Sequence, residues 1–144
     1  MLNHENNRGK INHIGRKQQI ITFENLVYNK ITPTDMDGLI EYKNKAYILL
    51  EIKYKETKLP IGQELALTRL IFDLNKVKNS ILIIAEHYID NYNNWIDARK
   101  CIVREVYYKN YKKGEVVKNK KIYKNKFTVG EIIDRFIENL EGVN

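Results

Sequence analysis

The sequence predicts an α/β fold in which a single mixed β-sheet is flanked by helices. Segments of strand length alternate with longer segments whose apolar residues recur every three or four positions. The strand expected at 46–54 is apolar on both faces over its first half, which is typical of a central strand in a sheet covered on both sides. A length of 144 residues fits one domain, 1–144, with a core of its own.

The N-terminal part combines a polar segment with an amphipathic one. Residues 1–13 are polar and are expected to be flexible. From Arg16 to Asn29 the spacing of apolar residues predicts a short helix. Pro33 ends that segment, because proline disfavours helical backbone in the residue before it.

A hairpin and a helix are expected next. Strands are predicted at 36–43 and 46–54, with a tight turn at Asn44-Lys45 between them. Pro60 then opens a helix that extends to about Lys76, a placement at a helix start that suits proline.

The second half of the chain predicts two further strands and a basic segment. A short buried strand is expected at 80–85 and another strand at 101–108, with a polar loop or lid at 86–98 between them. The basic segment 104–126 is expected to form a hairpin or loop that turns near Lys113-Gly114.

The last element is predicted to be a helix from Thr128 to Leu140. Thr128 is a good N-cap residue, and Glu131 three positions later completes a capping box. Its expected buried face consists of Val129, Ile132, Ile133, Phe136, Ile137 and Leu140.

Composition excludes several classes of protein. With 43% hydrophobic and 30% charged residues the chain is globular, and no apolar run approaches the roughly 20 residues that cross a membrane. The N-terminal residues contain no apolar signal segment. Cys101 is the single cysteine, so an internal disulfide and an all-cysteine zinc site are excluded. We therefore expect a cytoplasmic protein.

The positive charge is concentrated in one segment. The net charge is +7, and residues 104–126 alone hold nine basic and two acidic residues. Basic patches of this kind favour a polyanionic partner such as nucleic acid, although a solvated basic hairpin is the alternative. The residues expected to contact its phosphate backbone are Lys109, Lys112, Lys113, Lys118, Lys120, Lys121, Lys124, Arg16 and Lys17.

Three charged residues are expected to meet at one end of the hairpin. Glu51 and Lys53 alternate with Leu49 and therefore share the face of a buried strand. Charges on a core-facing surface are unfavourable unless they are paired or bind a metal. The hairpin returns Asp37 toward the same end. The alternative is a salt-bridged pair without a site.

This combination predicts metal-assisted phosphodiester chemistry. Two carboxylates can bind Mg²⁺, or Mn²⁺ in its place, because both ions prefer oxygen ligands. A bound divalent ion can activate water and neutralise charge on a phosphate, and a neighbouring lysine can stabilise the charge that develops.

Asp37, a spacer of thirteen residues, Glu51-Ile52-Lys53 and a following helix with an early Gln63 resemble the PD-(D/E)XK nuclease superfamily. The resemblance implies a restriction-endonuclease-like core over about residues 16–86. It further implies metal ligation by Asp37, Glu51 and the Ile52 carbonyl, with Lys53 and Gln63 as further catalytic residues.

Two acidic residues are additional candidates. The family has proline directly before its first aspartate, whereas this chain has Met36 there, and Asp35 competes with Asp37 as the ligand. Glu24 matches an acid that some members, including Holliday-junction resolvases, carry on the first helix. A turn residue at 35 and a solvated helix face at 24 are the alternatives.

The loop expected at 86–98 carries several ring side chains. Tyr88, Tyr92 and Trp95 could stack on nucleobases, but packing beneath the loop is the preferred interpretation. His87 follows a buried strand, where a structural role is preferred over one in the site.

The expected function is that of an Mg²⁺-dependent DNA endonuclease. Its small size favours structure-selective or weakly sequence-specific cleavage, similar to that of Holliday-junction resolvases, and a C₂ homodimer is a further hypothesis. The alternative is a non-catalytic nucleic-acid-binding protein on the same fold.

Overall fold

The computed structural model describes residues 19–110, 117–123 and 126–142. Backbone contacts divide the chain into two units, residues 1–33 and residues 34–144, and each is described by itself. Nothing in the described residues forms a helix that is long and apolar enough to cross a membrane.

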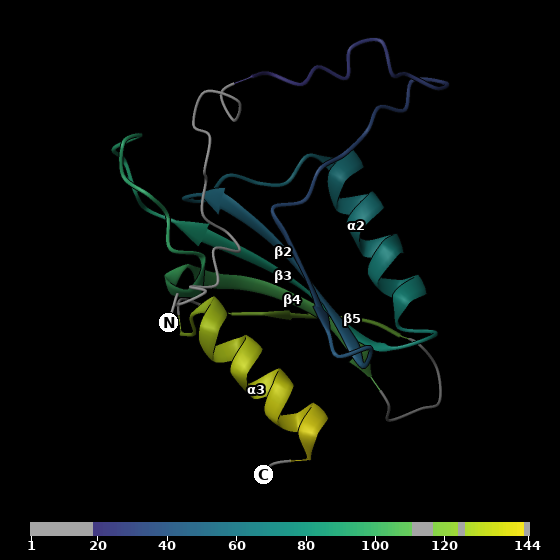
Figure 1. The fold of residues 1–144 in the computed structure, drawn as a ribbon, viewed down its shortest axis with the longest axis vertical. Helices are drawn as coiled ribbons and strands as arrows, with labels where there is room; N and C mark the ends of the chain where they lie inside the picture. Colours follow the sequence, from purple (N-terminus) through teal and green to yellow (C-terminus); the bar gives the residue numbers. More distant parts are fainter. Residues whose placement is uncertain (1–18, 111–116, 124–125, 143–144) are drawn as a thin grey trace, which may run out of the picture. The chain divides into compact units, whose positions relative to one another are not determined.

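The unit 34–144 is built on one five-stranded sheet with strand order β1-β2-β3-β4-β5 (Figure 1). The β2–β3 pair is parallel and the other three pairs are antiparallel, so the sheet is mixed and the α/β prediction is confirmed. The strands are β1 (Gly38–Tyr42), β2 (Ala46–Tyr54), β3 (Asn79–His87), β4 (Ile102–Asn110) and β5 (Val117–Ile122); the helical elements are α2 (Ile61–Leu74), the short 3₁₀ helix η1 (Ala98–Lys100) and α3 (Val129–Glu141).

The β1–β2 hairpin forms as the sequence predicts. Tyr42 pairs with Ala46, and Lys43 and Asn44 both adopt positive φ, at 48° and 58°. Asparagine tolerates this conformation better than most residues, which explains its place in the turn. The hairpin fixes the register in which Gly38 lies opposite Leu50.

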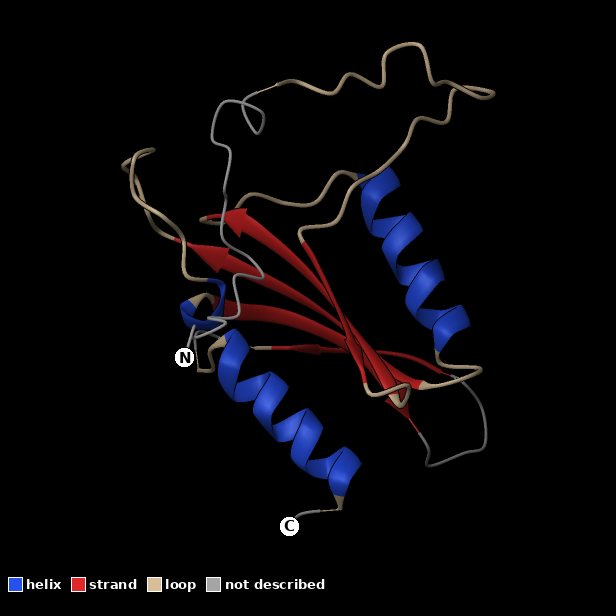
Figure 2. Cartoon of the chain, in the orientation of Figure 1, coloured by secondary structure: helices blue, strands red, loops and turns tan. Residues whose placement is uncertain are grey.

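The two long helices cover opposite faces of the sheet (Figure 2). On one face α2 packs Leu67 and Ile71 against Leu49, Leu82 and Ile84. On the other face α3 packs against a larger apolar cluster: Ile48, Leu50, Ile81, Ile83, Ala85, Cys101, Val103, Val106, Val129 and Ile132. Both faces of β2 and β3 are therefore buried, as expected for central strands.

Helix α2 connects β2 to β3 as a parallel crossover. Since the two strands run in the same direction, their carboxyl ends lie at the same edge of the sheet. Lys53 pairs with Glu86 and Tyr54 with His87 at that edge. The crossover thus brings together two strand ends that are more than thirty positions apart in the sequence.

Helix α3 begins and ends at clear signals. Thr128 and Glu131 form the predicted capping box, and Gly142 ends the helix in the left-handed conformation at φ 69°. Helix α2 has Pro60 as its N-cap and no side-chain cap.

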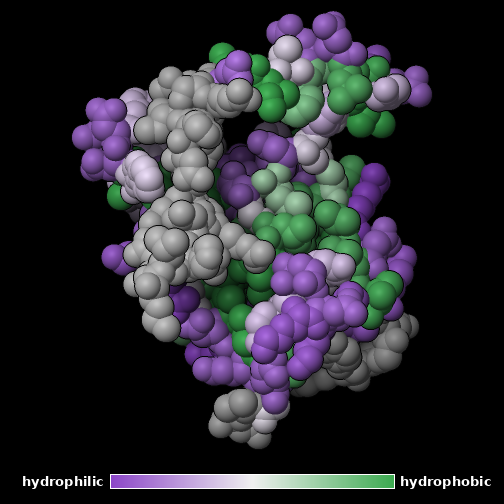
Figure 3. Space-filling view, viewed as in Figure 1, coloured by the Kyte–Doolittle hydropathy of each residue, from purple (hydrophilic) through white to green (hydrophobic). Residues whose placement is uncertain are grey.

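The helix predicted from Arg16 to Asn29 is wrong for the described residues 19–29, which form turns and an isolated bridge between Tyr28 and Ile31. Several of its apolar side chains are exposed, among them Ile20 at 91% and Ile21 at 78%. Figure 3 shows hydrophobic residues, in green, at the surface of the face in view. A short amphipathic helix is stable only when its apolar face is packed, and these exposures show that this condition is not met.

The basic segment pairs as a hairpin. Strand β5 runs antiparallel to β4 from Glu105↔Ile122 to Asn110↔Val117. The predicted turn at Lys113-Gly114 lies outside the described residues, as do Arg16, Lys17, Lys112 and Lys124, four of the residues expected to contact DNA.

Candidate active site

Glu51 and Lys53 lie at the carboxyl end of β2, on the face that α2 covers. Leu49 precedes them on that face and belongs to the cluster under α2. Strand alternation places Glu51 and Lys53 beyond it. The apolar core of this face therefore gives way to charged residues at one edge of the sheet.

The carboxylate of Glu51 is buried and only partly satisfied. The residue is 3% exposed, and Oε1 lies 2.7 Å from Lys53 Nζ and accepts a hydrogen bond from Gln63 Nε2 at 2.9 Å. Oε2 is buried and has no hydrogen-bond partner. A buried carboxylate oxygen without a partner requires an explanation, and a role in binding a ligand is one such explanation.

Gln63 connects the members of the cluster. It lies in the first turn of α2, on the buried stripe with Leu67 and Ile71. Its amide nitrogen donates to Glu51 and to the Asp35 carbonyl at 3.1 Å, and its oxygen accepts from Lys53 Nζ at 3.2 Å. A polar residue at an apolar position of the helix is thus accounted for by three hydrogen bonds.

Asp37 lies where β1 begins, beside β2. Its backbone N–H donates to the Leu50 carbonyl at 3.1 Å, and its Oδ2 accepts from the Ile52 N–H at 2.6 Å. The side chain therefore continues the pairing of β2 beyond the end of the regular ladder. A ligand role for the Ile52 carbonyl stays a prediction.

The structure distinguishes Asp35 from Asp37 by their contacts. Asp35 is exposed and meets the cluster through its backbone carbonyl, which Gln63 binds. Glu24 lies in the unit 1–33, where it is exposed and its N–H donates to Thr22 Oγ1 at 3.3 Å.

Sequence reasoning missed Glu86 and Arg104. Glu86 is 5% exposed, and Oε1 accepts a hydrogen bond from the Tyr88 hydroxyl at 2.7 Å, which raises the pKa of Tyr88. Its Oε2 has no hydrogen-bond partner and lies 3.6 Å from Arg104 Nη1. The signal was present, because Glu86 follows Leu82 and Ile84 at two-residue spacing, as Glu51 follows Leu49.

His87 makes its contacts with Tyr54 and Ile89. Its ring lies 5.4 Å from the ring of Tyr54, and Nδ1 accepts from the Ile89 N–H at 3.2 Å. Alternation places it on the face opposite Glu86.

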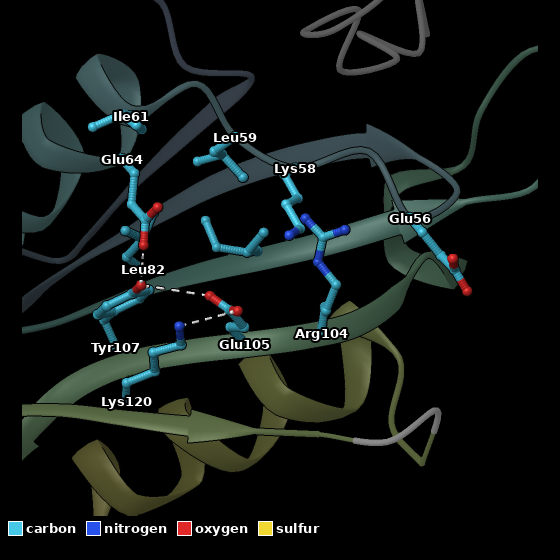
Figure 4. Close-up of a pocket in the computed structure, with 11 residues that line it drawn as sticks. Glu56, Lys58, Leu59, Ile61, Glu64, Leu82, Arg104, Glu105, Tyr107 and Lys120 are labelled. Atoms are coloured by element: carbon cyan, nitrogen blue, oxygen red, sulfur yellow. Dashed lines mark hydrogen bonds and ion pairs between the residues drawn. The ribbon is translucent and has the colours of Figure 1, made fainter.

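A cleft of about 440 Å³ opens on the α2 face of the sheet, between the start of α2 and strands β3 to β5 (Figure 4). Ile84, the register partner of Glu51, is among its lining residues. A chain of contacts crosses it, in which Lys120 lies 3.2 Å from Glu105 and the Tyr107 hydroxyl donates to Glu64 at 3.0 Å. Burial and the bond to Glu64 raise the pKa of Tyr107 far above its usual range.

The described basic candidates are already engaged within the fold. Lys109 Nζ donates to the Asn75 carbonyl at 3.0 Å, Lys120 pairs with Glu105, and Lys121 lies over the ring of Tyr123 at 5.1 Å. Arg104 donates to the Thr57 carbonyl through both terminal nitrogens at 3.0 Å. The side chains of Lys113 and Lys118 lie outside the described set.

The donor set for a metal is small. Within the described ranges no group of three or more His, Cys, Asp and Glu side chains is placed to hold a metal ion. What this edge offers is the carboxylates of Asp37, Glu51 and Glu86 and backbone carbonyls. Mg²⁺ is compatible with one or two carboxylates, because it keeps several waters and takes oxygens from its substrate.

No protein-family model matches the sequence, and no curated protein or solved structure matches it significantly. The assignment of a function therefore depends on the residues and their geometry.

Proposed function

We propose that this chain is an Mg²⁺-dependent nuclease that hydrolyses DNA phosphodiester bonds. The observation that carries the proposal is the state of Glu51, which is buried, held by Lys53 and Gln63, and left with one unpartnered oxygen near the carboxyl end of β2. Leaving such an oxygen without a partner is unfavourable in a protein interior. A ligand that binds this oxygen would remove that cost.

The residues that would hold the ion are Asp37 and Glu51, with the Ile52 carbonyl as the third protein oxygen. The bound ion would supply Lewis-acid stabilisation of a phosphate and a more acidic water, and Mn²⁺ would substitute for Mg²⁺. Asp37 is accessible to solvent, whereas Glu51 is not, so a phosphate would approach from the Asp37 side.

Lys53 is the proposed catalytic lysine. Its side chain is 22% exposed and its ammonium group lies 2.7 Å from Glu51, so the lysine is fixed by the carboxylate while part of the side chain remains reachable from solvent. A cation held in this way can stabilise negative charge that develops on a phosphate oxygen. Gln63 positions both groups, because it bonds to Glu51 and Lys53 at the same time.

The proposed substrate is DNA whose backbone contacts the basic hairpin β4–β5. The small size of the chain favours recognition of DNA structure over a long sequence, as in a Holliday-junction resolvase-like enzyme, and a homodimer would allow two strands to be cut together.

The test compares cleavage and metal binding in single variants. Asp37→Asn and Glu51→Gln keep the side-chain shape and are expected to lose both divalent-ion binding and cleavage. Lys53→Ala is expected to retain metal and DNA binding while cleavage falls about 10²–10³-fold, because a group that acts mainly in the transition state is removed. Calorimetric titration with Mg²⁺ and Mn²⁺ is measured beside cleavage of linear, flap, branched and four-way DNAs, with EDTA as the control.

Glu41→Gln and Lys43→Ala provide matched controls, because they alter a second acid-x-lysine triplet at the opposite end of the hairpin. Both should cleave at the wild-type rate. Full activity in Lys53→Ala, or normal metal binding by the Asp37→Asn, Glu51→Gln double variant, would contradict the proposal. DNA binding without cleavage in the wild type would favour the non-catalytic alternative.

A further inference from the structure

The loop of residues 88–97, here called the aromatic loop, leaves β3 at the edge of the sheet that carries the candidate site (Figure 1). The interpretation that its rings pack beneath the loop is wrong. Tyr92 is fully exposed, Trp95 is 84% exposed and Tyr88 is 49% exposed. Exposed apolar surface that gathers in one place often marks a binding site.

The aromatic loop is anchored at several points. The Tyr88 hydroxyl donates to Glu86, and the Tyr54 hydroxyl and Lys55 both bind Asp90, the lysine at 3.1 Å. The Tyr54 hydrogen bond, followed by that from Lys55, lowers the pKa of Asp90. The exposed rings are therefore attached to a base that is tied to β2 and β3.

Two clefts flank the aromatic loop, and each has an exposed ring in its wall. One cleft, of about 330 Å³, is lined by Tyr54 and Tyr92, and the other, of about 310 Å³, by Tyr88 and Trp95. His87, Ile89 and Ile96 line both. Each cleft thus offers an apolar floor beside a flat ring.

These clefts lie at the same edge of the sheet as the candidate active site, although alternation places Tyr54 and His87 on the other face from Lys53 and Glu86. Tyr54 directly follows Lys53, and Glu86, the register partner of Lys53, binds Tyr88. A strand whose phosphate reached Asp37 and Glu51 would have its neighbouring nucleotides close to this edge.

We propose that the aromatic loop binds unpaired nucleobases, and that the substrate class is nucleic acid with a single-stranded segment beside the cut site. This proposal rests on the proposed function for its catalytic meaning, and within that function it favours a single-stranded branch over the fully paired four-way junction of a Holliday-junction resolvase-like enzyme. Aromatic rings stack on unpaired bases of any sequence, whereas bases inside a duplex present only their edges.

The polar groups of the aromatic loop fit the same ligand. Asn91, Asn93 and Asn94 lie between the rings, and asparagine can donate to and accept from base edges. Acidic Asp90 and Asp97 offset Lys55 and Lys100 nearby, so phosphate attraction is not the main contribution of this surface. Stacking supplies the binding, and the basic hairpin supplies the backbone contacts.

The chain provides its own probe, because Trp95 is its single tryptophan. In EDTA, where no cleavage occurs, titration with a single-stranded oligonucleotide should quench Trp95 fluorescence, and a blunt duplex of the same sequence should do so far less. Among branched DNAs, a flap with a free single strand should bind more tightly than a fully paired four-way junction.

Variants assign the effect to the rings. With a labelled single-stranded oligonucleotide, Tyr92→Leu and Trp95→Leu should each weaken binding about 5- to 150-fold, the range expected for loss of one stacked base, and Trp95→Phe should retain most of the affinity. Phe72→Leu is the matched aromatic control, because Phe72 lies near the C-terminal end of α2, whereas the first turn of α2 contacts the candidate site. This variant should bind the oligonucleotide as tightly as the wild type does. Circular dichroism checks that each variant is folded.

Unchanged affinity in both leucine variants, or equal quenching by duplex and single strand, would overturn the proposal. A concentration-dependent blue shift of Trp95 emission without DNA would also overturn it, because the aromatic loop would then meet a second copy of the chain. The binding measurements contain no divalent metal, so they test base stacking independently of cleavage. If the aromatic loop binds single strands but the protein cleaves no DNA when Mg²⁺ or Mn²⁺ is added, only the nuclease proposal is contradicted.

Discussion

The two faces of the sheet differ in how far their apolar packing extends. On the α3 face, buried apolar residues continue along β2 and β3 from Ile48 and Ile81 to Ala85. On the α2 face the apolar cluster stops at Leu49 and Ile84, and the next residues on that face are Glu51 and Glu86. The same pair of strands thus supports a continuous core on one side and a charged site on the other.

The helices show the same difference. Helix α3 has a capping box and buries only apolar residues and Gly130. Helix α2 lacks a side-chain cap and buries Gln63 beside Leu67 and Ile71. A packed core is satisfied by volume alone, whereas Gln63 is satisfied only because Glu51, Lys53 and Asp35 lie around it. The α2 face therefore gives up some core packing in order to position polar groups.

The largest expected effect on stability is at the α3 face. Ile83 is completely buried in that cluster, and Ile83→Ala should lower the free energy of unfolding by about 2–5 kcal/mol, because it leaves a cavity. Urea denaturation measures the change. Ile61→Ala, at a position 85% exposed, is the control and should have little effect. A loss below about 1 kcal/mol in Ile83→Ala would contradict a tightly packed face.

A single substitution at the α2 face, Gln63→Leu, should reduce activity strongly although it changes the side-chain volume little. Gln63→Leu removes the hydrogen bonds to Glu51, Lys53 and the Asp35 carbonyl, and should reduce cleavage about 10–100-fold, as the loss of residues that orient ligands commonly does. Unfolding should become easier by about 1–3 kcal/mol, since buried groups lose a partner. Leu67→Met, one turn later on the same stripe, should cleave normally, and equal rates in the two variants would show that Gln63 has no positioning role.

The smallest effect concerns the start of α3. Thr128 Oγ1 accepts from the Glu131 N–H at 3.3 Å, and Thr128→Ala should cost about 0.5–2 kcal/mol of stability without changing cleavage by the folded protein. Thr128→Ser keeps the hydroxyl and should restore most of the loss. Thermal unfolding followed by circular dichroism compares the three proteins. A change in cleavage rate would show that the two faces are coupled.

Particular residues show how far the sequence predicts this molecule. Strand β2 has the bounds expected from its pattern, and α3 begins at its capping box, because both signals are local. The segment 16–29 has an equally regular apolar pattern, yet its described residues 19–29 are not helical. Periodicity indicates which face a helix would bury but does not supply the surface against which that face packs.

The residues of the candidate site likewise fall into those that the sequence predicts and those that only the tertiary structure brings there. Alternation along β2 and the length of the hairpin are enough to predict that Glu51, Lys53 and Asp37 lie at one end, and Gln63 belongs to the buried stripe of a helix that the sequence predicts. Glu86, Tyr88 and Arg104 come from elements that meet this edge only through the parallel pairing of β3 and its antiparallel neighbour β4.

The sequence by itself determined the strands of the hairpin, the start signal of α3 and the charged triplet, because each depends on spacing within a few residues. Only the tertiary structure decided that Glu86 is a second buried carboxylate beside Lys53, that one oxygen of Glu51 has no partner, and that Tyr92 and Trp95 are exposed. Burial and hydrogen-bond satisfaction depend on which distant segments pack together, and that is set by the crossover between β2 and β3.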